Sequence, residues 1–219
     1  MFVTNFMTEP VHTVGPEASL SQVKELFGQR KFRHLPIVDQ SGRLIGMLTD
    51  RDLRSAYPSG LMDENEKKAY LKRFKEMKVS QIMTETVAKL TPKSTLDDAL
   101  LLFDRSRVGA LPVVDDQQKV VGIFSIRDLL AAYKQLFGLG EKGSALIVVQ
   151  DDGKPRPLTR LTEALENRNV LFSQLIRDVL SRPDNGLGLI YVRVHTHNLS
   201  GVHAALAAAG FYAVTPEAS

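Results

Sequence analysis

Apolar and polar positions follow one recurring pattern over the first part of the chain. Leu20, Val23 and Phe27 form an i, i+3, i+7 stripe, which predicts a half-buried helix. Two β-branched runs follow at residues 35–38 and 44–48, and the polar, glycine-containing spacer between them is typical of a hairpin. A short extended segment before the first helix and a second helix after the hairpin complete a predicted β-α-β-β-α unit.

The same pattern occurs again 76 positions later, with no gap in the match. Met7 recurs as Met83, and Gly46 recurs as Gly122. Longer matches are LPIVD at 35–39 with LPVVD at 111–115, and RDL at 51–53 with RDL at 127–129. Agreement at this many spaced positions indicates a duplication. Because a unit of about 50 residues is too small to bury both faces of its sheet alone, we expect the two copies to pack sheet against sheet.

Capping residues mark the predicted helix starts, and a charged segment joins the repeats. Ser19 with Gln22, and Thr95 with Asp98, have the spacing of a capping box. Residues 61–78 between the repeats predict a charged amphipathic helix, which we interpret as a packing connector.

The pattern changes after a glycine-containing hinge at residues 139–143. The predicted elements beyond it are a strand at 145–149, a helix at 158–167, an edge strand at 170–176, a strand at 187–194, a helix at 199–209 and a strand at 211–214. The order βαββαβ predicts an α+β fold for this last third, as for the repeats.

Composition limits the classes of function. The 219 residues include 28 basic and 25 acidic side chains, for a net charge of +3, and no cysteine. The absence of cysteine excludes disulfides and thiolate chemistry, and the absence of a Lys/Arg run argues against nucleic acid as the ligand. No apolar stretch approaches the roughly 20 residues of a membrane span, and the start of the chain lacks the features of a signal peptide. We therefore expect a cytoplasmic protein.

Enzymatic and metal-binding signatures are weak. His195, His197 and His203 form one histidine cluster, but a metal site needs three or four ligands and no carboxylate lies at a suitable spacing. The sequence contains neither a G-x-S-x-G motif nor a Walker loop. We expect no catalytic residues and no metal, and we keep a metal-dependent activity only as a minor alternative.

A hydroxyl and a carboxylate three residues apart follow the second predicted strand of each repeat. These pairs are Thr49 with Asp52 and Ser125 with Asp128. A carboxylate there can accept two hydrogen bonds from a ribose diol, although both pairs could instead only cap the next helix. Their recurrence at one offset favours binding. Nearby arginines either reach a phosphate or simply lie on the surface; these are Arg51, Arg54 and Arg127.

The segments RHLPIVD…GRLIGMLTDRDL and VGALPVVD…QKVVGIFSIRDL resemble the two halves of a CBS pair, or Bateman module, over about residues 3–135. The resemblance implies that AMP, ADP, ATP, S-adenosylmethionine or a related ligand binds in two clefts between the repeats, and that the ribose-binding aspartate of one repeat faces an adenine pocket of the other.

The resemblance implies two different cleft linings. One cleft would have Thr49 and Asp52 facing Ala88, Val108, Gly109 and Ala110. The other would have Ser125 and Asp128 facing His12, Phe32, Arg33 and His34. The first lining is small and leaves room for a flat base. The second is bulkier and more basic, so that it either grips a phosphate or fills the cleft. We expect the first cleft to be the better ligand site.

The βαββαβ order of the last third is similar to that of an ACT domain, a ferredoxin-like regulatory fold that often dimerises and binds amino acids. Arg156 occupies the loop position where such ligand sites usually have glycine, so a dimerisation or signalling role is at least as well supported as amino-acid binding. A CBS pair followed by an ACT-like domain resembles the accessory proteins named for acetoin utilisation. The expected domains are 1–78 and 79–138 for the repeats and 144–216 for the ACT-like domain.

The resulting hypothesis is a non-enzymatic regulatory protein. It would be a homodimer that senses adenine nucleotides or S-adenosylmethionine and signals to a protein that the sequence does not identify. The alternative is a structural dimerisation adaptor whose clefts bind no ligand.

Overall fold

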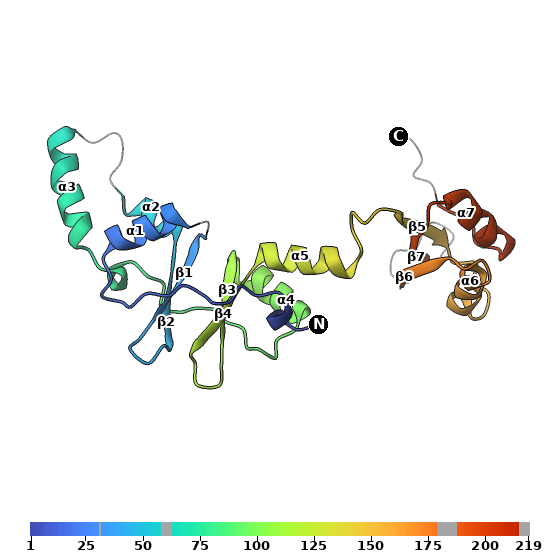
Figure 1. The fold of residues 1–219 in the computed structure, drawn as a ribbon, viewed down its shortest axis with the longest axis horizontal. Coiled ribbons are helices and arrows are strands. Elements are labelled where there is room, and N and C mark those ends of the chain that lie inside the picture. Colours follow the sequence, from blue (N-terminus) through green and yellow to red (C-terminus); the bar gives the residue numbers. More distant parts are fainter. Residues whose placement is uncertain (31, 58–62, 179–187, 215–219) are drawn as a thin grey trace. The chain divides into compact units, whose positions relative to one another are not determined.

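The chain folds into two compact units, Met1–Ala132 and Tyr133–Ser219 (Figure 1). The structure, a computed structural model, describes residues 1–30, 32–57, 63–178 and 188–214. Among these residues, none of the helices is long and apolar enough to span a membrane.

The first unit contains the two repeats, and each has the predicted order of elements. In repeat 1 these are the 3-10 helix η1 (Val3–Asn5), α1 (Leu20–Gln29), β1 (His34–Val38), β2 (Leu44–Thr49) and α2 (Asp50–Ser55). In repeat 2 they are η2 (Val79–Gln81), α4 (Leu96–Ser106), β3 (Ala110–Val114), β4 (Val120–Ser125) and α5 (Ile126–Leu136), whose last turn belongs to the second unit. The capping boxes predicted before α1 and α4 are both confirmed.

The two hairpins are identical in register at the 76-residue offset. β1 pairs antiparallel with β2, and Ile37 lies opposite Gly46. β3 pairs antiparallel with β4, and Val113 lies opposite Gly122. An irregularity directly follows Ile37 and Val113, so even this local departure from regular pairing is duplicated.

The segments that lead into the repeats are exchanged between them. Thr8, at the start of the chain, forms an antiparallel bridge with Ile123 of β4 in repeat 2. Thr84, which leads into repeat 2, forms the equivalent bridge with Met47 of β2 in repeat 1. Each bridge has two backbone hydrogen bonds of 2.9–3.2 Å. This exchange joins the two sheets and places each entry segment over the second strand of the other repeat.

The exchange explains why glycine recurs in β2 and β4. A Cβ atom on Gly46 would lie 2.7 Å from the Met83 sulfur, and one on Gly122 would lie 2.4 Å from the Met7 sulfur. Each glycine therefore makes room for the methionine that precedes the exchanged entry segment. The repeated methionine and glycine of the sequence form one reciprocal packing contact.

The charged segment between the repeats forms α3 (Glu64–Glu76), which packs on α1. Phe74 is 2% exposed, and Tyr70 and Met77 pack against the same repeat 1 core. This matches the predicted packing connector; residues 61 and 62 of that prediction lie outside the described residues.

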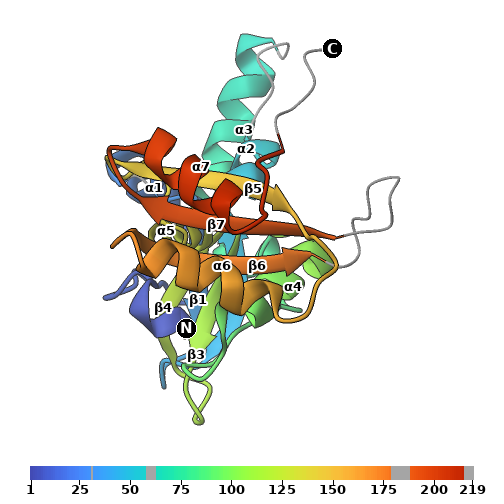
Figure 2. The same ribbon diagram turned by 90° about the vertical axis from the view of Figure 1, so that its right-hand side faces the viewer.

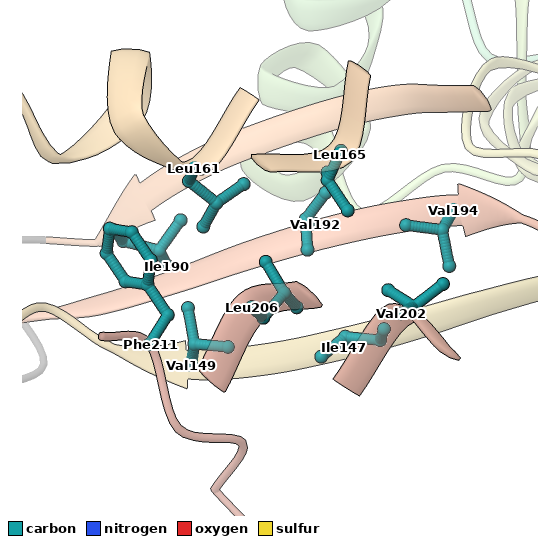
Figure 3. Packing of buried hydrophobic residues seen from close by; sticks show 10 residues of the cluster. All are labelled: Ile147, Val149, Leu161, Leu165, Ile190, Val192, Val194, Val202, Leu206 and Phe211. Carbon is teal, nitrogen blue, oxygen red and sulfur yellow. The ribbon is translucent and has the colours of Figure 1, made fainter. Parts of the chain in front are cut away.

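The second unit is a three-stranded antiparallel sheet with helices on one face. Its elements are β5 (Ser144–Gln150), α6 (Pro157–Glu166), β6 (Leu171–Asp178), β7 (Leu189–His195) and α7 (Leu199–Ala208), and the strand order is β5-β7-β6. Figure 2 shows α6 and α7 on the same side of the sheet. Figure 3 shows the apolar core between them, which includes Ile147, Leu161, Val192, Leu206 and Phe211.

Two details of this unit differ from a plain βαββαβ order. The last predicted strand, 211–214, is reduced to a single bridge between Ala213 and Val149. Arg156, directly before α6, adopts the left-handed conformation with φ 54° and ψ 50° that usually favours glycine. In the same loop, the buried carboxylate of Asp151 is held by the Arg177 guanidinium at 2.6 Å.

Candidate functional site

Two clefts lie between the repeats, each with a volume of about 420 Å³. The Thr49 cleft is lined by Arg33, His34, Met47, Thr49, Asp50, Arg51, Asp52, Arg54, Thr84, Thr86, Val87, Ala88, Arg107, Val108, Gly109 and Ala110. The Ser125 cleft is lined by Thr8, Pro10, Val11, His12, Phe32, Arg33, His34, Gly109, Ala110, Ile123, Ser125, Ile126, Arg127 and Asp128. Every residue that we predicted for each cleft from the sequence lies in its lining.

Each cleft contains one hydroxyl–carboxylate pair in a fixed geometry. The Thr49 backbone N–H and hydroxyl donate to Asp52 Oδ2 at 2.8 and 2.6 Å, and the Asp52 N–H donates back to the Thr49 hydroxyl at 3.3 Å. Ser125 and Asp128 have the same three contacts at 2.8, 2.7 and 3.3 Å. Both pairs thus cap their helices, as the simpler interpretation required.

The capping contacts use only one oxygen of each carboxylate. All three capping contacts of each pair involve Oδ2 or the hydroxyl, and the Oδ1 atoms of Asp52 and Asp128 take no part in them. Both side chains are half-buried at the cleft walls. Because the cap holds the carboxylate rigidly, Oδ1 is presented at a defined position, which favours recognition of a polar ligand group.

The exchanged entry segments supply part of each cleft. Residues 84–88 cross β2 and bring Ala88 opposite Thr49, while residues 8–12 cross β4 and bring His12 opposite Ser125. The sequence prediction missed most of these entry-segment residues. The recurrence of Met-Thr-Glu before each repeat was the signal that could have identified them.

The Ser125 cleft is not filled by its bulky residues. His12 and Phe32 stack on each other at 5.5 Å between ring centroids, and the cleft keeps the same volume as the Thr49 cleft. These side chains therefore leave the Ser125 cleft open.

The prediction that the Ser125 cleft is the more basic one is also wrong. Among the described residues, the Thr49 cleft has three arginines that the other cleft lacks, namely Arg51, Arg54 and Arg107. The Ser125 cleft has one such arginine, Arg127. Arg33 lines both. Arg107 was not predicted, because its place in the cleft depends on how the chain turns after α4.

The clefts share a wall. Arg33, His34, Gly109 and Ala110 line both of them, although the sequence assigned two of these residues to each cleft. A Cβ atom on Gly109 would lie 3.0 Å from two atoms of the His34 ring, so glycine at this position makes room for the imidazole. The two clefts thus share one wall, which includes His34.

Burial lowers the pKa of the His34 imidazole below its ordinary value of 6.5. The Asp52 carboxylate acts in the opposite direction, and the Arg33 guanidinium adds to the lowering. His34 is therefore neutral at pH 7 and can offer one donor and one acceptor nitrogen at the shared wall.

The histidines of the second unit are not arranged as a metal site within the described residues. His195 contacts the Ser173 hydroxyl at 2.9 Å and lies 3.7 Å from Glu141, and His197 and His203 are exposed. Among all the residues that the structure describes, no three or more His, Cys, Asp or Glu side chains are grouped so that they could hold a metal ion.

Comparison with known proteins identifies the two repeats. The CBS domain family matches residues 3–59 and 79–135. A CBS domain-containing protein of Dictyostelium discoideum is 31% identical over 130 residues, which is 59% of this chain and 89% of that protein. Inosine-5'-monophosphate dehydrogenase of Aquifex aeolicus is 31% identical over 123 residues, which is 56% of this chain but 22% of the enzyme.

Solved structures resemble the first unit. CBSX2 in complex with AMP is 28% identical with a TM-score of 0.52, covering 62% of this chain and 97% of that chain. The CBS pair of protein MJ0100 in complex with methylthioadenosine and S-adenosylmethionine is 25% identical with a TM-score of 0.50, covering 61% and 99%. A protein of Vibrio cholerae assigned to acetoin utilization (AcuB) is 27% identical with a TM-score of 0.52, covering 65% and 96%.

Proposed function

Since this chain belongs to the CBS domain family, we propose that it is a regulatory protein that senses adenine nucleotides (AMP, ADP or ATP) or S-adenosylmethionine in its two clefts and signals to a partner protein. The observation that carries the proposal is the duplicated cleft geometry. In each cleft, a rigidly held carboxylate of one repeat faces an opening lined by the other.

The proposed binding mode uses both walls of a cleft. The Asp52 and Asp128 Oδ1 atoms accept hydrogen bonds from the ribose diol, a charge-assisted interaction. The base lies against the opposite wall, at Val108 and Gly109 in the Thr49 cleft and at Phe32 in the Ser125 cleft. The complexes of CBSX2 with AMP and of MJ0100 with S-adenosylmethionine support these ligand classes.

Signalling would follow from a ligand that bridges two repeats. Such a ligand stabilises the relative orientation of the repeats in which both walls reach it, and shifts the population toward that state. We assign the second unit the role of an ACT-like output or dimerisation domain, on the strength of its helices on one face of an antiparallel sheet. We assign no catalytic activity to the protein, since the matched dehydrogenase has most of its length outside the shared region.

A dimer formed through repeat 2 is supported by an apolar surface that repeat 1 lacks. Four large apolar side chains on α4 and α5 are 41–69% exposed, namely Leu100, Leu101, Ile126 and Leu130. The equivalent positions of repeat 1 are all charged, namely Lys24, Glu25, Asp50 and Arg54. Exposed apolar patches of this kind are typical of protein contacts. Light scattering should show a dimer that Leu130→Arg converts to a monomer, and a monomeric wild-type protein would contradict the assignment.

Calorimetry of the full-length protein with AMP, ATP and S-adenosylmethionine tests the sensing function. We expect saturable binding of at least one ligand, and loss of it in the double variant Asp52→Asn, Asp128→Asn. Asparagine retains an oxygen for the cap, so unchanged thermal unfolding is the control for folding. If no ligand produces heat, the structural adaptor becomes the better description.

A further inference from the structure

The two clefts have equivalent ribose-facing pairs in different chemical surroundings. Building on the proposed function, we infer that they select different classes of adenosine ligand. The Thr49 cleft takes ligands that carry a phosphate group. The Ser125 cleft depends less on a phosphate and takes adenosine compounds mainly by contact with their base and ribose.

Cationic side chains distinguish the Thr49 cleft. Arg51, Arg54 and Arg107 line this cleft alone, and they come from two different repeats. Guanidinium groups suit bidentate contact with phosphate oxygens. Two of these arginines lie on α2, the helix that also carries Asp52.

Two of these arginines have distinctive local surroundings. The Arg54 guanidinium pairs with the Asp50 carboxylate at 2.9 Å, across one turn of α2. Arg107 follows the last turn of α4 with φ 52° and ψ 39°, a left-handed conformation in which glycine is the usual residue. An arginine there is unfavourable for the backbone, and its side chain lines the Thr49 cleft.

The Ser125 cleft retains one of these three arginines, because Arg127 occupies the position equivalent to Arg51 and lines this cleft. At the 76-residue offset, Ile126 of the Ser125 cleft occupies the position of Asp50 in the Thr49 cleft, and Pro10 occupies the position of Thr86. Arg54 has Leu130 as its equivalent, which does not line the cleft. Lys31, the equivalent of Arg107, lies outside the described residues.

The small base-facing residues of the Thr49 cleft are also replaced. His12 stands for Ala88 and Phe32 for Val108, and their stacked rings form an aromatic wall. Bases stack favourably on aromatic side chains whatever else the ligand carries. This cleft therefore obtains more of its affinity from the base, whereas Arg54 and Arg107 add contacts to a phosphate in the Thr49 cleft.

Titration of full-length single-cleft proteins with AMP and with adenosine tests the division. Asp128→Asn leaves the Thr49 cleft as the stronger site, and Asp52→Asn leaves the Ser125 cleft. We expect AMP to bind at least roughly tenfold more tightly than adenosine in Asp128→Asn protein, since hydrogen bonds to charged groups are among the strongest in water. In Asp52→Asn protein the two ligands should differ by less than about threefold, because stacking does not depend on the phosphate.

Arg107→Leu in the Asp128→Asn protein should weaken AMP binding by about tenfold and leave adenosine binding unchanged. The matched control is Arg105→Leu, which removes an exposed arginine of the same helix that lines neither cleft. The division would be overturned if the ratio of AMP affinity to adenosine affinity were the same in the two single-cleft proteins. It would also be overturned if Arg107→Leu and Arg105→Leu changed AMP affinity equally. Neither result would contradict the sensing function. Absence of binding by either ligand to the unaltered protein would overturn both.

Discussion

The Thr49 and Ser125 clefts descend from one duplicated unit, yet they have retained different parts of it. The hydroxyl–carboxylate cap is the same in both, to within 0.1 Å in each hydrogen bond. Arginines line both clefts, but the surrounding residues differ: the Thr49 cleft adds Arg54, Arg107 and small side chains, and the Ser125 cleft has a stacked aromatic pair. The constant part also caps a helix, and of the variable part Phe32 also packs against the repeat 1 core, beside Phe27.

This contrast shows how a duplicated protein can change ligand preference without losing its structure. The capping carboxylate cannot be replaced without cost, because it satisfies backbone N–H groups at a helix start. A residue such as Ala88 or His12, on the opposite wall, does not cap a helix. In the proposed function, specificity therefore differs between the clefts at the wall opposite the capping carboxylate.

The largest effect is expected from removing the ribose-facing carboxylate. Asp52→Ala should weaken AMP binding by roughly a hundredfold, because it removes charge-assisted hydrogen bonds, and Asp128→Ala should weaken it less. Calorimetry measures both. Part of any loss comes from the helix cap, at about 1 kcal/mol, so the paired asparagine variants serve as controls. Equal losses, or a greater loss for Asp128→Ala, would contradict our ranking of the clefts.

Gly46→Val tests whether the exchange of entry segments supports the Thr49 cleft. Its new side chain would meet Met83 and the Thr84 carbonyl oxygen, which lies 3.2 Å from the position of a Cβ atom. We expect a destabilisation of about 1–3 kcal/mol from overpacking, measured by urea unfolding. Gly28→Ala is the control, since no atom lies within 4 Å of its Cβ position and helix propensity favours alanine by about 0.5–1 kcal/mol. A neutral Gly46→Val would refute the packing argument.

A smaller effect is expected from exchanging base-facing residues between the clefts. Ala88→His gives the Thr49 cleft the residue of the Ser125 cleft and narrows the space for the base, so AMP should bind several-fold more weakly to Asp128→Asn protein. His12→Ala makes the reverse change and should weaken adenosine in Asp52→Asn protein, because Phe32 loses its stacking partner. Tighter binding after either exchange would show that the residues act in a different way.

The smallest effect concerns the shared wall. Because burial lowers the pKa of His34, the folded protein binds its proton less readily than the unfolded chain. Unfolding therefore takes up a proton as the pH falls below about 6.5, and stability decreases in that range. An NMR titration should give His34 a pKa below 6.5, and His34→Gln should reduce the pH dependence of unfolding. A pKa above 6.5 would mean that the Asp52 carboxylate outweighs burial.

Local patterns were enough to predict most elements of the fold. The stripe of α1, the capping boxes at Ser19 and Thr95 and the two hairpins all lie where periodicity and spacing placed them. The last strand was overestimated, because Ala213 forms only one bridge with β5. Apolar alternation alone does not show how many ladder contacts a terminal segment makes.

The candidate site was predictable where the repeat carried it and unpredictable where it depended on packing. Thr49 and Asp52 were recognisable because their spacing recurs at one offset. Arg107 was not, since its direction depends on the left-handed turn after α4. The double role of His34 depends on the absence of a side chain at Gly109, 75 residues away.

The sequence by itself determined the duplicated unit, its helix caps and the hydroxyl–carboxylate pairs, because all of these depend on neighbours within a few residues. Only the tertiary structure decided that the entry segments are exchanged, that Arg51, Arg54 and Arg107 gather in one cleft, and that both clefts meet at His34. These features arise when two sheets pack together, and contacts between distant residues leave no periodic trace in either partner.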